Sequence, residues 1–439
     1  MEDYSAIERI EVEAIDSIIE EDRRREFVIN IKKNLRELGL PLSTDCCIYR
    51  VPDTLRKLNE KLFTPLVVSI GPFHHSKEGL KITENFKMRC LERFLQHSNC
   101  NVEDLVDTIK SWEGDIRRCY AETIHLSSED FVKLILLDAC FVIEFFISES
   151  QPILWSPEDR VLLKPWLTDA IVTDFTLLEN QLPFFVMDRL FNINASELGI
   201  LEVPRSFARL SIDFFWKLNL QGSTRCDDMD DLEIKHFVDL VRTLLLPSSD
   251  AQLEREYPIV GHMYNASQLN EAGLEFKVGY RKSLVDLQFT NGALEIPYLE
   301  LDTCMELTLR NVVAFELCHY PENAHVGDYI VLMTFLLRTT KDEDLLIEKG
   351  IMVNWVGENN AATAFFNNLC PHVLLLNMNT SYIRLADDLN AFCKVPWHAW
   401  KATFKRDYFS TPWRTFSTVA AVTLLVLTLI QTVCSLKQV

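Results

Sequence analysis

The C-terminal end of the chain carries the feature that most limits how the protein folds. Residues 418–436 form a run of 19 residues without a charge, a proline or a glycine, and Gln431 is its one strongly polar side chain. A helix rises ~1.5 Å per residue, so a run of this length crosses the ~30 Å hydrocarbon core of a bilayer. We therefore predict a transmembrane helix over 418–436 and a short tail at 437–439. A buried C-terminal helix of a soluble protein is the alternative.

The residues before this run favour a membrane anchor. Residues 397–417 form a predicted juxtamembrane neck, which contains Trp397, Trp400, Lys401, Lys405, Arg406, Trp413 and Arg414. Tryptophan is enriched at the membrane interface, and Lys and Arg are enriched on the cytosolic side of a span. We therefore expect membrane lipid as one partner, a single-pass topology with a cytosolic body, and the plasma membrane as the location.

The charge of the chain limits its other partners. The formal net charge is −20. Residues 390–439 hold six basic residues and one acidic residue, so the remaining 389 residues hold 38 basic and 63 acidic residues, a net charge of −25. A body this acidic is repelled by phosphate backbones, so we exclude nucleic acid as a partner.

The cysteines and the N-terminus also indicate a cytosolic body. Twelve cysteines are scattered without a C-x-x-C pair, and the N-terminus lacks the basic segment and apolar core of a signal peptide. We predict reduced thiols rather than a disulfide scaffold. The glycosylation sequons at Asn194, Asn265 and Asn379 leave an exterior body open as the alternative.

The apolar spacing predicts a mainly α-helical protein. Residues 1–40 form an acidic amphipathic helix region, which either docks on the body or serves as a partner helix. Residues 41–396 form a multi-helical body. In it, 131–147 is apolar on nearly every side, but Lys133, Asp138 and Glu144 indicate a core helix rather than a second span. Asp138 then needs a buried partner such as an arginine.

Two further patterns complete the predicted fold. Residues 174–191 are expected to form a helix that kinks or restarts at Pro183. Short extended runs near 274–301, with Asn291-Gly292 between two of them, predict a small β hairpin or ribbon. The fold class is thus a mainly α-helical globular body with this ribbon, plus one C-terminal transmembrane helix.

Two polar clusters are candidates for chemistry. His74 and His75 are adjacent, and neighbours on a helix point ~100° apart, so they favour local hydrogen bonding over metal binding. Glu179, Asn180 and Gln181 precede a proline, and a buried Glu there is either an acid or base or part of a structural polar network. The chain has no glycine-rich phosphate loop and no nucleophile elbow. We therefore expect no catalytic residue, metal or cofactor.

Several segments occur together in the order of a known family. They are Val51-Pro52 with Leu55-Arg56 and Asn59, VSIGPFHH (68–75), FVKLILLDACFVIE (131–144), LLENQLPFF (177–185), ASQLNEAGLEFK (266–277), LEIP (294–297), RNVVAFE (310–316), KGIMVNWVG (349–357), WHAWKATFKRDYFSTPW (397–413) and IQTVCS (430–435). On these segments the chain resembles the plant family called domain of unknown function 247 over nearly its whole length. The resemblance implies a helical body, one C-terminal span and no established enzyme activity.

These observations lead to a function hypothesis. We expect a non-enzymatic, membrane-anchored interaction or recognition module with a protein partner. The resemblance also implies a candidate role in self-incompatibility recognition, which is associated with some grass members of the family. An unrecognised membrane-tethered enzyme that uses the His74-His75 pair or the 179–181 cluster is the alternative.

Overall fold

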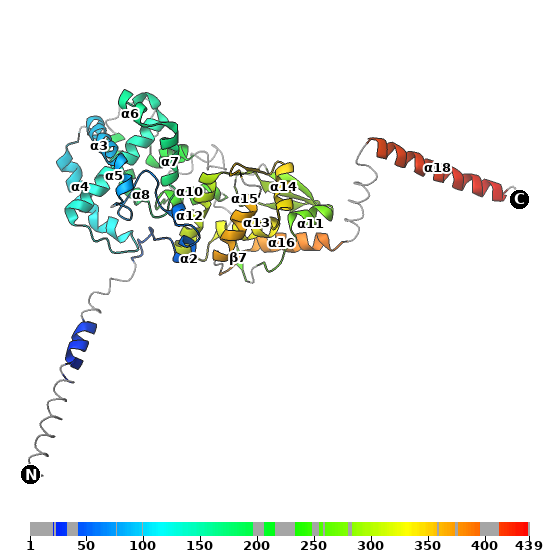
Figure 1. Cartoon of the computed structure of the whole chain (residues 1–439), viewed down its shortest axis with the longest axis horizontal. Coiled ribbons are helices and arrows are strands. Elements are labelled where there is room, and N and C mark those ends of the chain that lie inside the picture. The colour runs from blue at the N-terminus through cyan, green and yellow to red at the C-terminus, as the bar shows by residue number, and fades with distance from the viewer. Residues whose placement is uncertain are drawn as a thin grey trace, which may run out of the picture.

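The protein is described from a computed structural model. The structure describes residues 21, 23–32, 43–75, 77–98, 100–195, 206–215, 233–247, 254–257, 260–279, 283–357, 360–373, 376–395 and 412–437. Within these residues the chain is mainly helical with a few short strands, as predicted. The body contains two groups of helices, with α10 (Phe237–Leu245) and α12 (Thr303–His319) between them (Figure 1).

The first group is built around the long helix α5 (Ser128–Ser150). The Ser127 hydroxyl accepts a hydrogen bond from the Asp130 backbone N–H and caps the start of the helix. Every residue from Phe131 to Ser148 except Lys133 is buried. A helix that is apolar on all sides needs neighbours on all sides. Those neighbours are α3 (Glu84–Ser98), α4 (Val102–Arg118), α8 (Phe184–Ala195) and α9 (Phe207–Phe214), which confirms the predicted core helix.

Aromatic rings fill the core beside α5. The ring of Phe146 stacks on that of Phe214 with a centroid separation of 3.9 Å. Phe175 meets the Phe146 ring edge-on, and Phe237 of α10 stacks on the same ring. The aromatic cluster thus joins α5, α9 and α10, which are distant in the sequence.

The second group of helices comes from both sides of α12 in the sequence. Its members are α11 (Ala266–Glu271), α13 (His325–Leu336), α14 (Thr340–Glu348), α15 (Ala361–Leu369) and α16 (Thr380–Cys393). Helix α13 packs against α12 and α15, while α11 packs against α14 and α16. Shorter helices connect the elements: α2 (Asp53–Arg56), η1 (Glu60–Phe63), η2 (Glu78–Thr83), η3 (Pro152–Leu154), α6 (Pro157–Leu162), α7 (Pro165–Asp174) and η6 (Cys370–His372).

The predicted β ribbon is present and is more complex than a hairpin. Strands β3 (Gln288–Thr290) and β4 (Ala293–Pro297) are antiparallel and are joined at Asn291 and Gly292, whose φ angles are 52° and 78°. Positive φ at both positions is the geometry of a tight hairpin turn. Strand β2 (Glu275–Gly279) adds to β4 in parallel. Two further pairs are β5 (Leu299–Leu301) with β6 (Met352–Asn354), in parallel, and β1 (Arg255–Glu256) with β7 (Met378–Asn379), antiparallel.

The prediction for residues 174–191 is wrong in its first half. Helix α7 ends at Asp174, residues 175–183 are not helical, and α8 begins only at Phe184. Asp174, Asn180 and Gln181 use their side chains to bond backbone groups, and such bonds compete with a helix. Pro183 therefore precedes a helix rather than kinking one.

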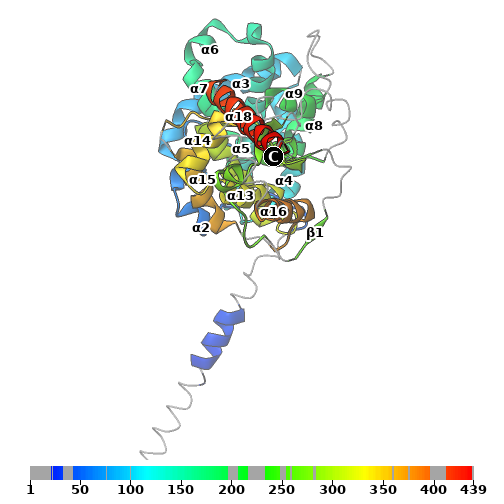
Figure 2. The ribbon, with the colours of Figure 1, turned by 90° about the vertical axis from the view of Figure 1, so that its right-hand side faces the viewer.

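The C-terminal helix α18 (Pro412–Lys437) has the length and apolarity to cross a membrane. Its apolar stretch runs over Thr415–Val433, and none of that stretch is buried. The helix stands apart from the body in Figure 1, and the turned view of Figure 2 shows it in front of the body. It starts at Pro412, inside the region predicted as the neck, where proline is well tolerated as a first helical residue. Residues 23–32 are also helical and exposed, whereas the helix predicted before them lies outside the described residues.

Candidate functional site

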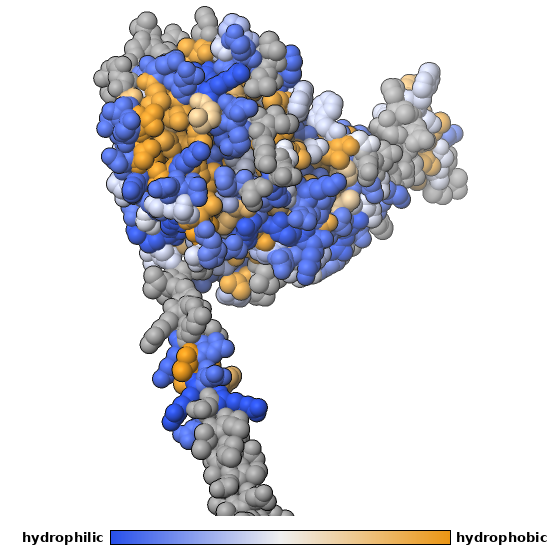
Figure 3. Space-filling model, turned by 60° about the vertical axis from the view of Figure 1, so that its left-hand side comes forward, coloured by the Kyte–Doolittle hydropathy of each residue, from blue (hydrophilic) through white to orange (hydrophobic). Residues whose placement is uncertain are grey.

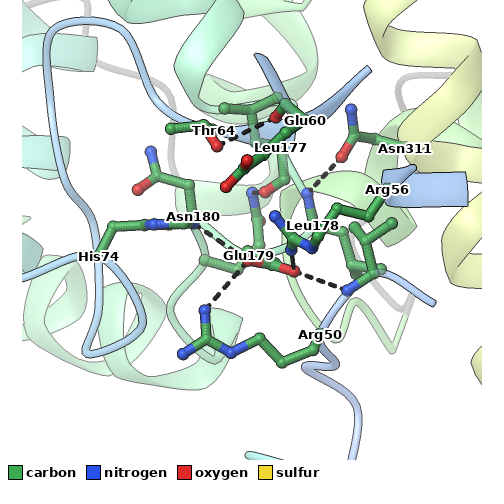
Figure 4. Close-up of polar contacts among 12 residues, drawn as sticks. Arg50, Arg56, Glu60, Thr64, His74, Leu177, Leu178, Glu179, Asn180 and Asn311 are labelled. Atoms are coloured by element: carbon green, nitrogen blue, oxygen red, sulfur yellow. Dashed lines mark hydrogen bonds and ion pairs between the residues drawn. The ribbon is translucent and has the colours of Figure 1, made fainter. Parts of the chain in front are cut away.

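The predicted cluster at residues 179–181 lies in the loop between α7 and α8. The side chains of Glu179 and Asn180 reach residues 48–75, a segment with little regular structure that passes over this loop. Figure 4 shows Glu179 surrounded by Arg50, Arg56 and His74. The predicted 179–181 cluster and His74 therefore form one cluster.

Glu179 is the centre of the cluster. One of its oxygens, Oε1, accepts a hydrogen bond from the Val51 backbone N–H at 2.7 Å and also contacts Arg56. The other, Oε2, pairs with Arg50 at 3.1 Å. Although burial opposes ionisation, hydrogen bonds from His74 and Val51 and the charge of Arg56 lower the pKa of Glu179 to about 2. Glu179 is therefore ionised at neutral pH, and Arg50 and Arg56 balance its charge. A group with so low a pKa is a poor general base.

The two adjacent histidines point to different surroundings. His74 is buried, and its Nε2 lies 3.2 Å from Oε2 of Glu179. Burial lowers the pKa of His74, so this ring is neutral near pH 7. His75 is exposed. The structure thus brings His74 to the 179–181 cluster and leaves His75 out of it. No group of three or more His, Cys, Asp or Glu residues in the described part of the chain is arranged to hold a metal ion.

Asn180 and Gln181 hold the backbone of the two loops. The Asn180 side chain accepts from the Ile70 N–H at 2.7 Å and donates to the carbonyls of Val68 and Asp174. The Gln181 side chain donates to the carbonyls of Phe175 and Leu177 and accepts from the N–H of Phe237. The side chain of Gln181 thereby satisfies backbone carbonyls of the non-helical residues 175–183. The side chain of Asn180 holds the segment that contains Val68 and Ile70.

Two further carboxylates belong to the same network: Asp138, for which a buried partner was expected, and Asp174, which the sequence did not mark. Asp174 accepts hydrogen bonds from three consecutive backbone N–H groups, those of residues 66, 67 and 68, at 2.8 to 2.9 Å. Asp138 accepts from the Gly71 N–H at 2.8 Å and pairs with the Lys87 ammonium at 2.7 Å. The expected arginine partner of Asp138 is thus a lysine. Only the apolar surroundings of Asp138 signalled a buried partner, and nothing near Asp174 marked it.

Gly71 is the point of closest approach between the two loops. Its φ is +73°, and a Cβ built there would lie 2.6 Å from the carbonyl oxygen of Gln181 and 3.1 Å from the hydroxyl of Tyr120. That hydroxyl itself donates to the same carbonyl at 3.0 Å. Only glycine fits, because both the backbone conformation and the space exclude a side chain.

Gly71→Ala is therefore expected to destabilise the body by at least about 2 kcal/mol, because left-handed strain and a backbone clash add. Urea unfolding of the full-length protein in detergent, followed by circular dichroism, measures the change. Gly79→Ala is the matched control, since nothing lies within 4 Å of a Cβ at that position. Equal midpoints for the two variants would contradict the assigned role of Gly71.

A buried histidine beside this network provides a pH test. His236 donates from Nε2 to the Cys47 carbonyl at 3.0 Å and accepts from the Asp239 N–H at Nδ1. Burial lowers its pKa to about 3. The unfolded chain, with an ordinary histidine pKa near 6.5, binds this proton first as pH falls. The contribution of His236 to stability is therefore complete above about pH 6.5 and is lost as pH falls toward 3.

We expect His236→Gln to flatten the dependence of unfolding free energy on pH between about 6.5 and 4.5. One proton corresponds to about 1.4 kcal/mol per pH unit, so the wild-type slope should fall by about that amount. Urea unfolding at a series of pH values measures both slopes. Burial and Arg255 lower the pKa of His325 to about 3 as well. The unfolding free energy of the variant should therefore still decrease somewhat as pH falls. If unfolding free energy depends on pH with the same slope in the wild type and in His236→Gln, a neutral buried His236 is ruled out.

The predicted neck residues are only partly described. Trp413 and Arg414 lie in the first turn of α18, and the Trp413 side chain is 83% exposed. The neck residues Trp397, Trp400, Lys401, Lys405 and Arg406 lie outside the described residues. An exposed tryptophan at the start of an apolar helix is the arrangement that a membrane interface favours.

Comparison with known proteins identifies the family. A profile described as a plant protein of unknown function, domain of unknown function 247, matches residues 48–427. The chain belongs to this family. The UPF0481 protein At3g47200 of Arabidopsis thaliana is 29% identical over 413 residues, which cover 88% of this chain and 85% of the relative. The putative UPF0481 protein At3g02645 of the same plant is 23% identical over 92% of this chain and 93% of its own length. No solved structure matches.

The matched region gives the polar cluster a family context. Residues 48–75 and 174–183, which supply every side chain of the cluster, lie inside it, as do most of α18 and all of the described body after residue 47. In this member of the domain of unknown function 247 family, the 179–181 cluster and His74 together fasten one loop segment to another. The chemistry of the cluster is hydrogen bonding and charge compensation around a buried carboxylate.

Proposed function

We propose that this protein is a single-pass, membrane-anchored module that works through protein contacts and catalyses no reaction. The observation that carries the proposal is the exposed apolar stretch of α18, Thr415–Val433, attached to a folded acidic body. Apolar side chains at such density are stable only in lipid or against a partner. Lipid is the proposed environment, because the stretch has the length of a bilayer core.

The orientation and the membrane are part of the proposal. The basic neck favours a body in the cytosol, and the plasma membrane is the proposed location. The geometry of two sequons supports this orientation. Asn379 is 6% exposed and caps α16, and the side chain of Asn265 accepts the capping hydrogen bond of α11. A glycan on Asn379 is incompatible with its burial in the folded body.

The body offers contact surfaces suited to a protein partner. Figure 3 shows a mostly hydrophilic face with a hydrophobic area above the point where the N-terminal residues leave the body. Exposed apolar areas rimmed by polar residues are typical of interaction sites. The finer form of the proposal is a role in self-incompatibility recognition, in which the acidic surface of the cytosolic body selects its protein partner.

The alternative, a membrane-tethered enzyme, requires His74 or Glu179 to touch a substrate. The contacts favour a structural role, because both Glu179 oxygens already accept bonds from Val51 and the two arginines. His74 is 4% exposed, which leaves little surface for a substrate. An active site would instead present converging polar groups in an open pocket.

Two measurements test the proposal. In sealed microsomes, external protease should digest the body and leave a membrane-embedded C-terminal fragment; a protected, glycosylated body would reverse the orientation. Cross-linking in plant membranes should join the body of the anchored chain to defined proteins. A truncation after Lys394 at equal abundance should lose those cross-links. If the truncated chain keeps them and the biological activity, the anchor is not required.

A further inference from the structure

Two buried cysteines from distant parts of the sequence meet at the edge of the first helix group. The N–H groups of Cys47 and Ile48 both donate to the Cys119 carbonyl at 2.9 Å, and Ile48 forms a parallel bridge with Tyr120. Cys47 and Cys119 are therefore neighbours in register, and their two thiols share a hydrogen bond. Paired strands lie about 4.8 Å apart, which is inside the Cα separation of about 4.4–6.8 Å that a disulfide spans.

Both thiols line an open cleft of about 390 Å³, although each cysteine exposes only about one-twentieth of its surface. Residues of four segments line the cleft, and its charged residues are Asp45, Asp115, Arg118, Arg189, Glu233 and Lys235. Arg118 is engaged with Asp45 and Asp115, and the Arg189 guanidinium lies over the rings of Trp112 and Phe185. A small solute in the cleft thus meets the small exposed part of each cysteine among three basic and three acidic side chains.

We propose that Cys119 and Cys47 form an oxidisable thiol pair that reacts with a small hydroperoxide, with Cys119 as the attacking thiol and Cys47 as the resolving thiol. The proposal rests on the backbone register of the two residues and on the cleft that opens onto them. It is independent of the interaction role proposed above.

The electrostatics of the pair favour Cys119 as the attacking thiol. The hydrogen bond from Cys47, with help from Arg118, lowers the pKa of the Cys119 thiol although burial opposes the change. The same bond and burial raise the pKa of Cys47. The thiolate is the nucleophilic form of cysteine, so Cys119 reacts first. Other buried thiols are less reactive: burial raises the pKa of Cys90 to about 12 and that of Cys140 further.

The reaction balances in two steps. The Cys119 thiolate attacks one peroxide oxygen, an S–O bond forms, the O–O bond breaks, and hydroxide or alkoxide leaves with a proton from the medium. The Cys47 sulfur then attacks the Cys119 sulfur; the S–S bond forms, the S–O bond breaks, and water leaves with the thiol proton. The hydroperoxide is reduced by two electrons, and the protein loses two hydrogen atoms.

The product would close a ring between the start of the body and the end of α4. Cys47 lies four residues before Val51, whose N–H binds Glu179. Oxidation would therefore fasten covalently the segment that the 179–181 cluster holds by hydrogen bonds.

The full-length protein in detergent tests the pair directly. It is titrated with hydrogen peroxide, blocked with N-ethylmaleimide and digested with trypsin without reductant. The expected product joins the peptides 37–50 and 119–133, lacks the mass of two hydrogen atoms, and disappears on reduction. It should form at lower peroxide than the oxidation of Cys393, a partly exposed cysteine outside the cleft.

Matched variants separate the two adjacent cysteines, which share one tryptic peptide. Cys46→Ser should keep the linked peptide, whereas Cys47→Ser and Cys119→Ser should reduce it on the order of tenfold or more. Cys47→Ser should also accumulate a sulfenic acid on Cys119 that dimedone traps. Circular dichroism confirms that each variant is folded. Loss of the link in Cys46→Ser, or oxidation of Cys393 before the pair, would overturn the proposal.

Discussion

Asp138→Asn is expected to destabilise the body by about 3–5 kcal/mol, because it leaves the buried Lys87 ammonium with the half-exposed Glu84 as its one remaining carboxylate partner. Lys87 is 1% exposed and Asp138 is fully buried. Burial opposes the charge on Lys87, but the carboxylates of Asp138 and Glu84 outweigh it and raise its pKa. Lys87 also donates to the Ser69 carbonyl at 2.6 Å, so the lost charge pair loosens the segment that leads to Gly71.

A double-mutant cycle measures this coupling. Urea unfolding of the full-length protein in detergent gives the free energy for Asp138→Asn, Lys87→Met and the double variant. We expect the double variant to be more stable than the sum of the single changes predicts, because it contains no unpaired buried charge. Arg209→Ala breaks a half-exposed pair with Asp213 and should cost about 0.5 kcal/mol. A similarly small cost for Asp138→Asn would contradict a buried ion pair.

The second large effect is expected in the anchor. Replacing both Leu425 and Leu429 by arginine places two charges near the middle of α18, where each costs about 2.5–3.5 kcal/mol on insertion. The combined cost corresponds to a shift of roughly three to five orders of magnitude in partitioning. We therefore expect the variant to leave the membrane fraction on alkaline carbonate extraction, whereas the wild type stays with the pellet.

A conservative pair of substitutions controls for position. Leu425→Val with Leu429→Val changes the same two exposed side chains without adding charge, and the resulting chain should remain in the pellet. Circular dichroism of the released arginine variant should show a folded body, because α18 makes no buried contact. Retention of the arginine variant in the membrane would mean that another part of the chain holds the protein there.

Local signals in the sequence predicted the parts of the fold that depend on neighbouring residues. The core helix α5, the turn at Asn291-Gly292 and the apolar helix α18 each follow from a pattern within one segment. The family resemblance is likewise confirmed by the match over residues 48–427. The start of α18 was placed too late, because Pro412 and Trp413 resemble a neck as much as a first helical turn.

The candidate site could be predicted only in part, because its partners come from far along the chain. Glu179, Asn180 and Gln181 stood out as polar residues among apolar ones, and burial in a polar network was one of the two interpretations given. Nothing local marks Val51 as the partner of Glu179, 128 residues away, or Leu66 as that of Asp174, 108 residues away. The first half of the helix expected over 174–191 is wrong, because the side chains of Asn180 and Gln181 bond the backbone of the loop, whereas the helix does restart after Pro183 as α8.

The loop from Leu66 to Gly71 has a consequence for how the protein is made. Its backbone N–H groups donate hydrogen bonds to the side chains of Asp138, Asp174 and Asn180. These acceptors follow the donors by 67 to 110 residues in the sequence. At about 5–20 residues per second, a ribosome delivers the last of these acceptors roughly 5–20 s after the loop itself. Throughout that interval the nascent segment is unpaired and apolar in part. Early synthesis of this protein is therefore the stage at which molecular chaperones have the most to protect.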